Sequence, residues 1–150
     1  MGDIVIKLDT EHTPKTAENF ITLATKGFYN ETRFHRIIPN FMIQGGDPQS
    51  SDISKKDLWG TGGPGYQFAD EIGSTNSNAR GTISMANSGP NTNGSQFFIN
   101  TVDNSFLNPK HTAFGTVTKG MDIVDMISKS ETDTRDRPVK DVIIEKVIVE

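Results

Sequence analysis

Residues 28–47, FYNETRFHRIIPNFMIQGGD, carry the strand pattern from which the fold is predicted. Aromatic and β-branched residues dominate this stretch, and Pro39-Asn40 interrupts it with a turn signal. It therefore predicts two strands joined by a turn. Similar short runs recur along the chain at intervals of about ten residues, a spacing typical of all-β proteins. We expect strands at residues 66–68, 82–85, 96–100 and 113–117.

The flanking segments predict two helices and two further strands. Residues 4–8 alternate apolar and polar side chains, the period of a strand with one face inward. Thr13 and Pro14 suit the N-cap and first turn of a helix, and Gly27 suits its left-handed end. The apolar stripe of this helix contains Ala17, Phe20, Ile21 and Ala24. A second helix is expected after Gly120, with apolar residues Ile123, Val124, Met126 and Ile127. Residues 142–149 are expected to form the last strand.

The order of these elements indicates the fold class. Seven or eight short strands are expected with only two isolated helices, and strands and helices do not alternate. We therefore expect a mainly β protein with a closed antiparallel barrel, in one domain that covers residues 1–150. The interior of a small barrel is filled by side chains, so a ligand would bind on the outer face or on the loops.

Composition excludes several classes of function. The net charge is −4 and no five like charges follow one another, which disfavours a nucleic-acid surface. The absence of cysteine excludes disulfides, thiolate metal sites and cysteine nucleophiles. No apolar run approaches the roughly 18 residues of a membrane span, and no signal sequence is visible. The three histidines are not spaced as metal ligands. We expect a cytoplasmic monomer without metal or cofactor.

Three further signals have ordinary explanations. Residues 60–65 match G-x-G-x-x-G, but a polar loop precedes the match, Pro64 interrupts it and no helix follows, so a surface turn is favoured over a nucleotide site. Residues 133–137 form a mixed charge run, which is typical of a solvated loop. Trp59 stands alone in a polar loop and is compatible both with a partner contact and with packing onto the barrel.

Three long segments resemble the signature segments of the cyclophilins. They are FHRIIPNFMIQGGD at 34–47, SMANSGPNTNGSQFF at 84–98 and NSFLNPKHTAFG at 104–115, and the resemblance extends from Ile4 to Val149. It implies peptidyl-prolyl cis-trans isomerase activity, which assists protein folding, on proline-containing peptides and flexible protein segments. It also implies an eight-stranded barrel capped by two α-helices, with the active groove on the outer face.

The resemblance assigns roles to individual residues. Arg36 matches the catalytic arginine, and we group Gln44 and Asn87 with it as catalytic candidates. The expected walls of the proline pocket are Phe41, Met42, Phe98 and Leu107. Gln44, Ala86, Asn87 and Gln96 match positions that orient the peptide backbone, His111 matches the pocket rim, and His35 precedes the arginine as in the family.

Other interpretations of these residues remain open from the pattern alone. Met42 and Phe98 look like core residues, and Arg36 is equally compatible with an ion pair. A module that binds proline peptides without turnover is the main rival function. Phe106 stands where many cyclophilins carry a tryptophan, whose indole N–H the resemblance assigns to cyclosporin binding. We therefore predict weakened cyclosporin binding, with isomerase activity largely kept.

Overall fold

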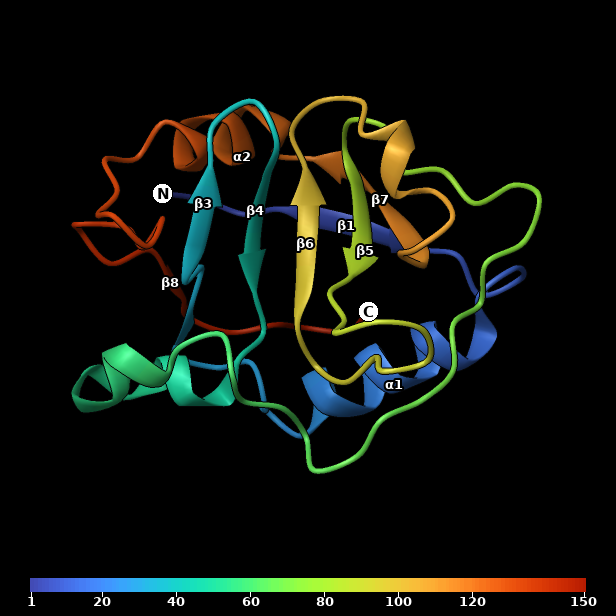
Figure 1. The fold of residues 1–150 in the computed structure, drawn as a ribbon, viewed down its shortest axis with the longest axis horizontal. Helices are drawn as coiled ribbons and strands as arrows, with labels where there is room; N and C mark the ends of the chain where they lie inside the picture. The colour runs from blue at the N-terminus through green and yellow to red at the C-terminus, as the bar shows by residue number, and fades with distance from the viewer.

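The computed structural model describes all 150 residues. Six strands form one antiparallel sheet in the order β1-β7-β5-β6-β4-β3, and two more form a small second sheet, β2-β8. The strands are β1 (Val5–Leu8), β2 (Thr32–Arg33), β3 (Arg36–Ile38), β4 (Met42–Gly45), β5 (Thr82–Met85), β6 (Phe97–Asn100), β7 (Ala113–Lys119) and β8 (Ile143–Ile144). Figure 1 shows β3, β4, β6 and β5 standing beside one another, with β1 passing behind them, so the large sheet curls round on itself.

The expected class, mainly β with eight strands and two helices, is confirmed, but the hydrogen bonds do not form one closed ring. Residues 34 and 35 separate β2 from β3, and β8 pairs only with β2. The free edge of β3 is instead covered by the loop around Asp136, whose carbonyl accepts a hydrogen bond from Ile37 N–H at 2.8 Å. A loop therefore protects the edge that a strand of a continuous barrel would occupy.

Helix α1 (Pro14–Thr25) begins where the sequence predicts, but it is capped differently. Thr13 makes no side-chain cap, because its hydroxyl donates to the Asp9 carbonyl. The carboxylate of Glu71 takes its place and accepts from the backbone N–H groups of Lys15 and Thr16. An acceptor with negative charge satisfies orphan donors there and also interacts favourably with the helix dipole.

One apolar core fills the space between the curled sheet and the two helices. It contains 16 buried residues, from α1, from α2 (Met121–Ser128), from the inward positions of the strands and from connecting segments, which supply Tyr29, Phe34 and Val142. Ile6 and Leu8 pack against it, as the alternation in residues 4–8 predicts. In α1 the buried stripe includes Leu23, while Ile21 is only half-buried. Figure 1 shows α1 and α2 at opposite ends of the sheet.

Several expected strands are shorter or absent. Residues 66–68 form only an isolated bridge between Phe68 and Asn93, and the last strand is limited to β8. The polar loop after β4 contains two 3-10 helices, η1 (Pro48–Ser51) and η2 (Ile53–Leu58). Neither α1 nor α2 has the length and apolar character that a membrane crossing would need.

Candidate active site

The outer face of the sheet carries a row of side chains from three adjacent strands. Arg36 of β3 pairs with Gln44 of β4, and Gln44 pairs in turn with Phe98 of β6. Residues directly opposite one another in an antiparallel sheet lie on the same face, and neighbours along a strand alternate. Ile37 and Ile43 therefore point into the core, where they are fully buried. The alternation places Arg36, Gln44 and Phe98 together on the opposite face.

A second, smaller apolar cluster lies on this outer face. Its buried members are Met42, Phe98 and Leu107, which are 2%, 4% and 8% exposed. Ile38, Phe41 and Ala86 pack against them and are partly open to solvent. Leu107 comes from the 3-10 helix η3 (Ser105–Leu107), which lies between β6 and β7 in the sequence. The four expected pocket walls are thus neighbours, in a cluster separate from the main core.

A chain of side-chain amides connects Arg36 to the neighbouring loop. The guanidinium of Arg36 donates to Gln44 Oε1 at 3.4 Å, and Gln44 Nε2 donates to Gln96 Oε1 at 3.0 Å. Gln96 Nε2 donates in turn to the carbonyls of Gly60 and Gly62, at 3.0 and 2.8 Å. Each amide has a fixed orientation, because its oxygen accepts and its nitrogen donates. Gln44 is therefore held with its oxygen toward Arg36.

The glycine-rich loop at residues 60–65 is held by a buried carboxylate. Asp47 is fully buried and accepts from the backbone N–H groups of Gly60 and Gly62. A phosphate-binding loop must offer such N–H groups to its ligand, and here the carboxylate already occupies them. A Cβ at Gly62 would collide with the Asp47 side chain, so glycine is required at this position. The surface-turn interpretation agrees with this geometry, and the nucleotide interpretation does not.

His111 and Asn87 lie on the side of the cluster formed by β5 and η3. The ring of His111 packs edge-on against Phe98 with centroids 5.3 Å apart. Its Nδ1 donates to the Met85 carbonyl at 2.9 Å, because a carbonyl oxygen can only accept, and this bond fixes the orientation of the ring. Asn87 Nδ2 donates to the Lys110 carbonyl at 2.8 Å. Asn87 therefore braces two loops against each other.

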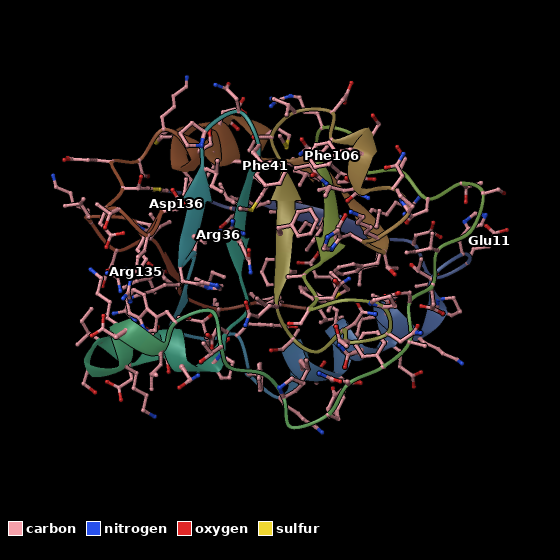
Figure 2. The ribbon with its side chains drawn as sticks, viewed as in Figure 1. Glu11, Arg36, Phe41, Phe106, Arg135 and Asp136 are labelled. Carbon is pink, nitrogen blue, oxygen red and sulfur yellow. The ribbon has the colours of Figure 1, made fainter.

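Phe106 extends the apolar surface at the edge of the cluster. It is 63% exposed and stacks on Phe41, with ring centroids 5.9 Å apart and an interplanar angle of 18°. Figure 2 shows these two rings next to each other, with Arg36 further along β3. The position expected to carry a tryptophan thus holds an exposed ring that offers no hydrogen-bond donor.

His35 is not part of the apolar cluster. Its ring is 2% exposed, and neither ring nitrogen has a hydrogen-bond partner. Burial lowers the pKa of His35 because it penalises the charged form, and the Asp47 carboxylate opposes this effect in part. His35 borders a polar pocket next to Arg36, together with Gly60. It is therefore buried beside the polar pocket that Arg36 also borders.

A buried network of amides under the outer face was not apparent from the sequence. Asn100 Nδ2 donates to Thr82 Oγ1 at 2.9 Å, and Asn104 Nδ2 donates to Asn100 Oδ1 at 2.8 Å and to the Phe41 carbonyl at 2.9 Å. Asn78 and Asn100 are fully buried. Because Asn104 immediately precedes η3, this network fixes the segment that carries Leu107. Isolated asparagines give no sequence signal for such a role, since the same residue type is common in turns.

Sequence reasoning also missed the basic residues beside Arg36. Arg135 and Arg137, which the charge pattern assigned to a solvated loop, border the pocket that Arg36 and Gln44 share. Trp59 lies there as well, with its indole N–H donating to the Asp52 carbonyl at 3.1 Å and Arg33 over its ring at 5.3 Å. Trp59 therefore packs onto its own chain. The pairing of the Asp136 loop with β3 brings these residues together.

Comparisons with known proteins agree on one family. The family model described as "Cyclophilin type peptidyl-prolyl cis-trans isomerase/CLD" matches residues 1–149. Peptidyl-prolyl cis-trans isomerase-like 1 of Aspergillus fumigatus is 47% identical over 153 residues, which cover 100% of this chain and 91% of that protein. A peptidyl-prolyl cis-trans isomerase of Arabidopsis thaliana is 49% identical over 150 residues, but this chain spans only 23% of its length.

The fold comparison gives the same result. A crystal structure of a Cryptosporidium parvum cyclophilin-type isomerase, determined in the presence of the dipeptide Ala-Pro, superimposes with a TM-score of 0.91 at 34% identity. The match covers 99% of this chain and 93% of that one. Sequence and fold thus agree along the whole chain, and the chain belongs to the family of cyclophilin-type peptidyl-prolyl cis-trans isomerases.

Proposed function

We propose that this chain accelerates cis-trans isomerisation of X-Pro bonds in peptides and flexible protein segments, and that the outer face of β3, β4 and β6 is its active groove. The observation that carries the proposal is the position of Arg36 in the row that leads to the apolar cluster. A guanidinium beside an apolar slot suits a substrate that presents a proline ring and an adjacent amide. The Ala-Pro dipeptide used with the Cryptosporidium parvum relative supports this substrate class.

The reaction requires stabilisation of a twisted amide. Resonance imposes a barrier of roughly 18–20 kcal/mol on rotation about the peptide bond. The cis and trans forms of X-Pro differ by only about 0.5–1 kcal/mol, so the enzyme gains little by preferring either planar form. It must instead bind the twisted state more tightly than both. No nucleophile, metal or cofactor is needed for this step.

Arg36 would supply the differential interaction. On twisting, the prolyl nitrogen regains its lone pair, and a fixed guanidinium can donate to that nitrogen only in the twisted state. The walls Met42, Phe98 and Leu107 would hold the ring while the preceding carbonyl swings. Gln44 would act as a positioning residue, because its oxygen accepts from Arg36 and limits the rotamers of the guanidinium.

The rival function, a proline-peptide module without turnover, is weakened by the surroundings of Arg36. No carboxylate lies within 4.0 Å of its guanidinium, and its side-chain partner is the neutral oxygen of Gln44. An arginine with a purely structural role would be expected to pair with an acid. An exposed guanidinium without such a partner remains free to interact with substrate.

The direct test is Arg36→Ala, with exchange of a model Ala-Pro peptide followed by NMR. Loss of one preorganised donor typically costs about 2.7–4 kcal/mol of transition-state stabilisation, so kcat/KM should fall roughly a hundred- to thousandfold. The thermal midpoint should barely move, because Arg36 is exposed and has no ion pair. Arg36→Lys serves as the matched variant: it keeps the charge but loses the planar fork, and it should also be impaired. Near-native exchange by Arg36→Ala would overturn the assignment, whereas tight peptide binding with no exchange in the wild type would favour the binding module.

A further inference from the structure

A polar pocket of about 220 Å³ adjoins the proposed groove on the far side of Arg36 from the apolar cluster. Arg36 and Gln44 belong to both regions. The other walls come from His35 and from two distant segments, which are the end of η2 with the two residues after it (Lys56, Asp57, Trp59 and Gly60) and the loop that carries Arg135 and Arg137. Figure 2 shows Arg36 between Arg135 on one side and the Phe41–Phe106 pair on the other.

The pocket wall is positively charged, although the whole chain is negatively charged. The whole chain carries −4, yet the pocket wall holds four cationic side chains and a single carboxylate, that of Asp57. Arg36 and Lys56 have no carboxylate within 4.0 Å. Arg137 is anchored from behind by Asp133, at 2.8 Å. The wall thus keeps an excess of positive charge toward its opening.

The one carboxylate in the wall is weakly held. Asp57 lies 3.5 Å from Arg135 and 3.3 Å from Arg137, and its side chain is 89% exposed. Exposed pairs of this kind contribute little, about 0–1 kcal/mol, because water screens them. Asp57 therefore resembles a placeholder that an incoming anion could replace at small cost.

A second, independent observation points to a ligand. His35 lines the same pocket, is 2% exposed and leaves both ring nitrogens without a partner. Buried polar groups in proteins are nearly always hydrogen-bonded, so a ring that lies just beneath the pocket surface with both nitrogens unpaired is a group that an incoming polar atom could satisfy. A neutral imidazole N–H can donate to a carboxylate or phosphate oxygen.

We propose that this pocket binds an anionic side chain that flanks the prolyl bond of the substrate, so that the enzyme prefers acidic or phosphorylated X-Pro segments. The inference rests on the proposed function, because it uses the peptide held at Arg36 to bring the anion to the pocket. An extended chain advances about 3.3–3.6 Å per residue, so a residue one to three positions from the proline can reach across the arginine. Carboxylate and phosphate share the required chemistry, and the test separates them.

The experiment compares matched Ala-Pro peptides with serine, glutamate or phosphoserine, placed at one to three positions on either side of the proline. For the wild type, kcat/KM should be about tenfold higher for an anionic peptide than for the serine peptide, the low end of what a charge-assisted hydrogen bond provides. The preference should shrink as salt is raised, because the wall is open to solvent. A gain with phosphoserine alone would identify phosphate as the preferred anion, and a gain with both would identify any anionic group.

Variants then tie the preference to the pocket. The double variant Lys56→Gln/Arg135→Gln should bring the ratio of anionic to serine peptide close to one and leave turnover of the serine peptide unchanged. Asp57→Asn should raise the ratio. Lys7→Gln, which removes one charge from β1 at the opposite edge of the sheet, is the control and should leave the ratio unchanged.

Failure of the pocket and failure of the groove give different results. Normal turnover of the serine peptide with no anionic preference at any tested position would overturn the pocket proposal alone. A preference that survives in the double variant would overturn it as well. Absence of turnover of the serine peptide by the wild type would instead contradict the proposed isomerase activity.

Discussion

Truncation of Leu107 separates a role in the proline pocket from a role in stability. Leu107 is 8% exposed and belongs to the outer cluster with Met42 and Phe98. Leu23 of α1 is 5% exposed and belongs to the main core. Leu23→Ala is therefore a matched control, because it makes the same substitution at a buried site away from the outer cluster. Both variants leave a cavity that typically costs about 2–5 kcal/mol, with Leu107→Ala at the lower end because its cluster is small and open on one side.

The effect on substrate follows from the lost contact area. Leu→Ala removes three carbons, worth about 0.8 kcal/mol each when buried, or about 2.4 kcal/mol in total. Leu107 is only 8% exposed, so most of this loss falls on stability, and substrate binding should lose the contact of about one carbon, about 0.8 kcal/mol. That corresponds to a rise in KM of roughly fourfold. Since the ring is held equally in the planar and twisted states, kcat should change little.

The assays are urea unfolding for stability and NMR exchange over a range of Ala-Pro peptide concentrations for KM. Leu107→Ala should raise KM and lower the unfolding midpoint, whereas Leu23→Ala should lower the midpoint alone. If Leu107→Ala loses stability but keeps KM within twofold of wild type, the cluster is a structural feature and the pocket lies elsewhere. An equal rise of KM in Leu23→Ala would mean that general loosening, and not lost contact, explains the effect.

Three further outcomes are expected. Gly62→Ala should lower the thermal midpoint by several degrees, because the new Cβ meets the Asp47 carboxylate, whereas Gly63→Ala, with no atom within 4 Å, should not. The free energy of unfolding should fall as pH drops below about 6.5, because burial lowers the pKa of His35 in the folded state and the unfolded chain therefore binds the proton more readily. The thermal midpoint of His35→Gln should depend less steeply on pH in that range. Phe106→Trp should tighten cyclosporin binding by isothermal titration, with peptide exchange nearly unchanged, and an affinity of the unaltered chain equal to that of the variant would contradict the expected role of the indole donor.

Local patterns were sufficient to predict most of the fold. Strand β5 matches its expected bounds, and β6 differs by one residue at its start. Alternation fixes which side chains of a strand share a face once the strand is known, and in β3 it places Arg36 and Ile37 on opposite faces. The resemblance was needed to separate Met42 and Phe98 from the main core, because a buried outer cluster and a buried inner core have the same composition.

Features that depend on distant parts of the chain were not predictable from local patterns. Glu71 caps α1 through the N–H of Thr16, which lies 55 residues before it, and Arg137 donates to the carbonyl of Lys56, 81 residues away. Nothing in the spacing of these residues indicates that they meet. The prediction of a closed barrel was wrong for the same reason. Only the folded chain shows that the loop around Asp136, and not a strand, covers the edge of β3.

The proposed groove and the core are built from alternate residues of the same strands. A pairing error of one residue at β3 would turn Arg36 inward and Ile37 outward, and would thus bury a charge at the moment that it removed the catalytic candidate. Misfolded sheets of this kind would be both unstable and inactive. The specific activity of a refolded sample should therefore be proportional to the fraction of chains that have folded correctly. Refolding yield can then be measured from activity alone.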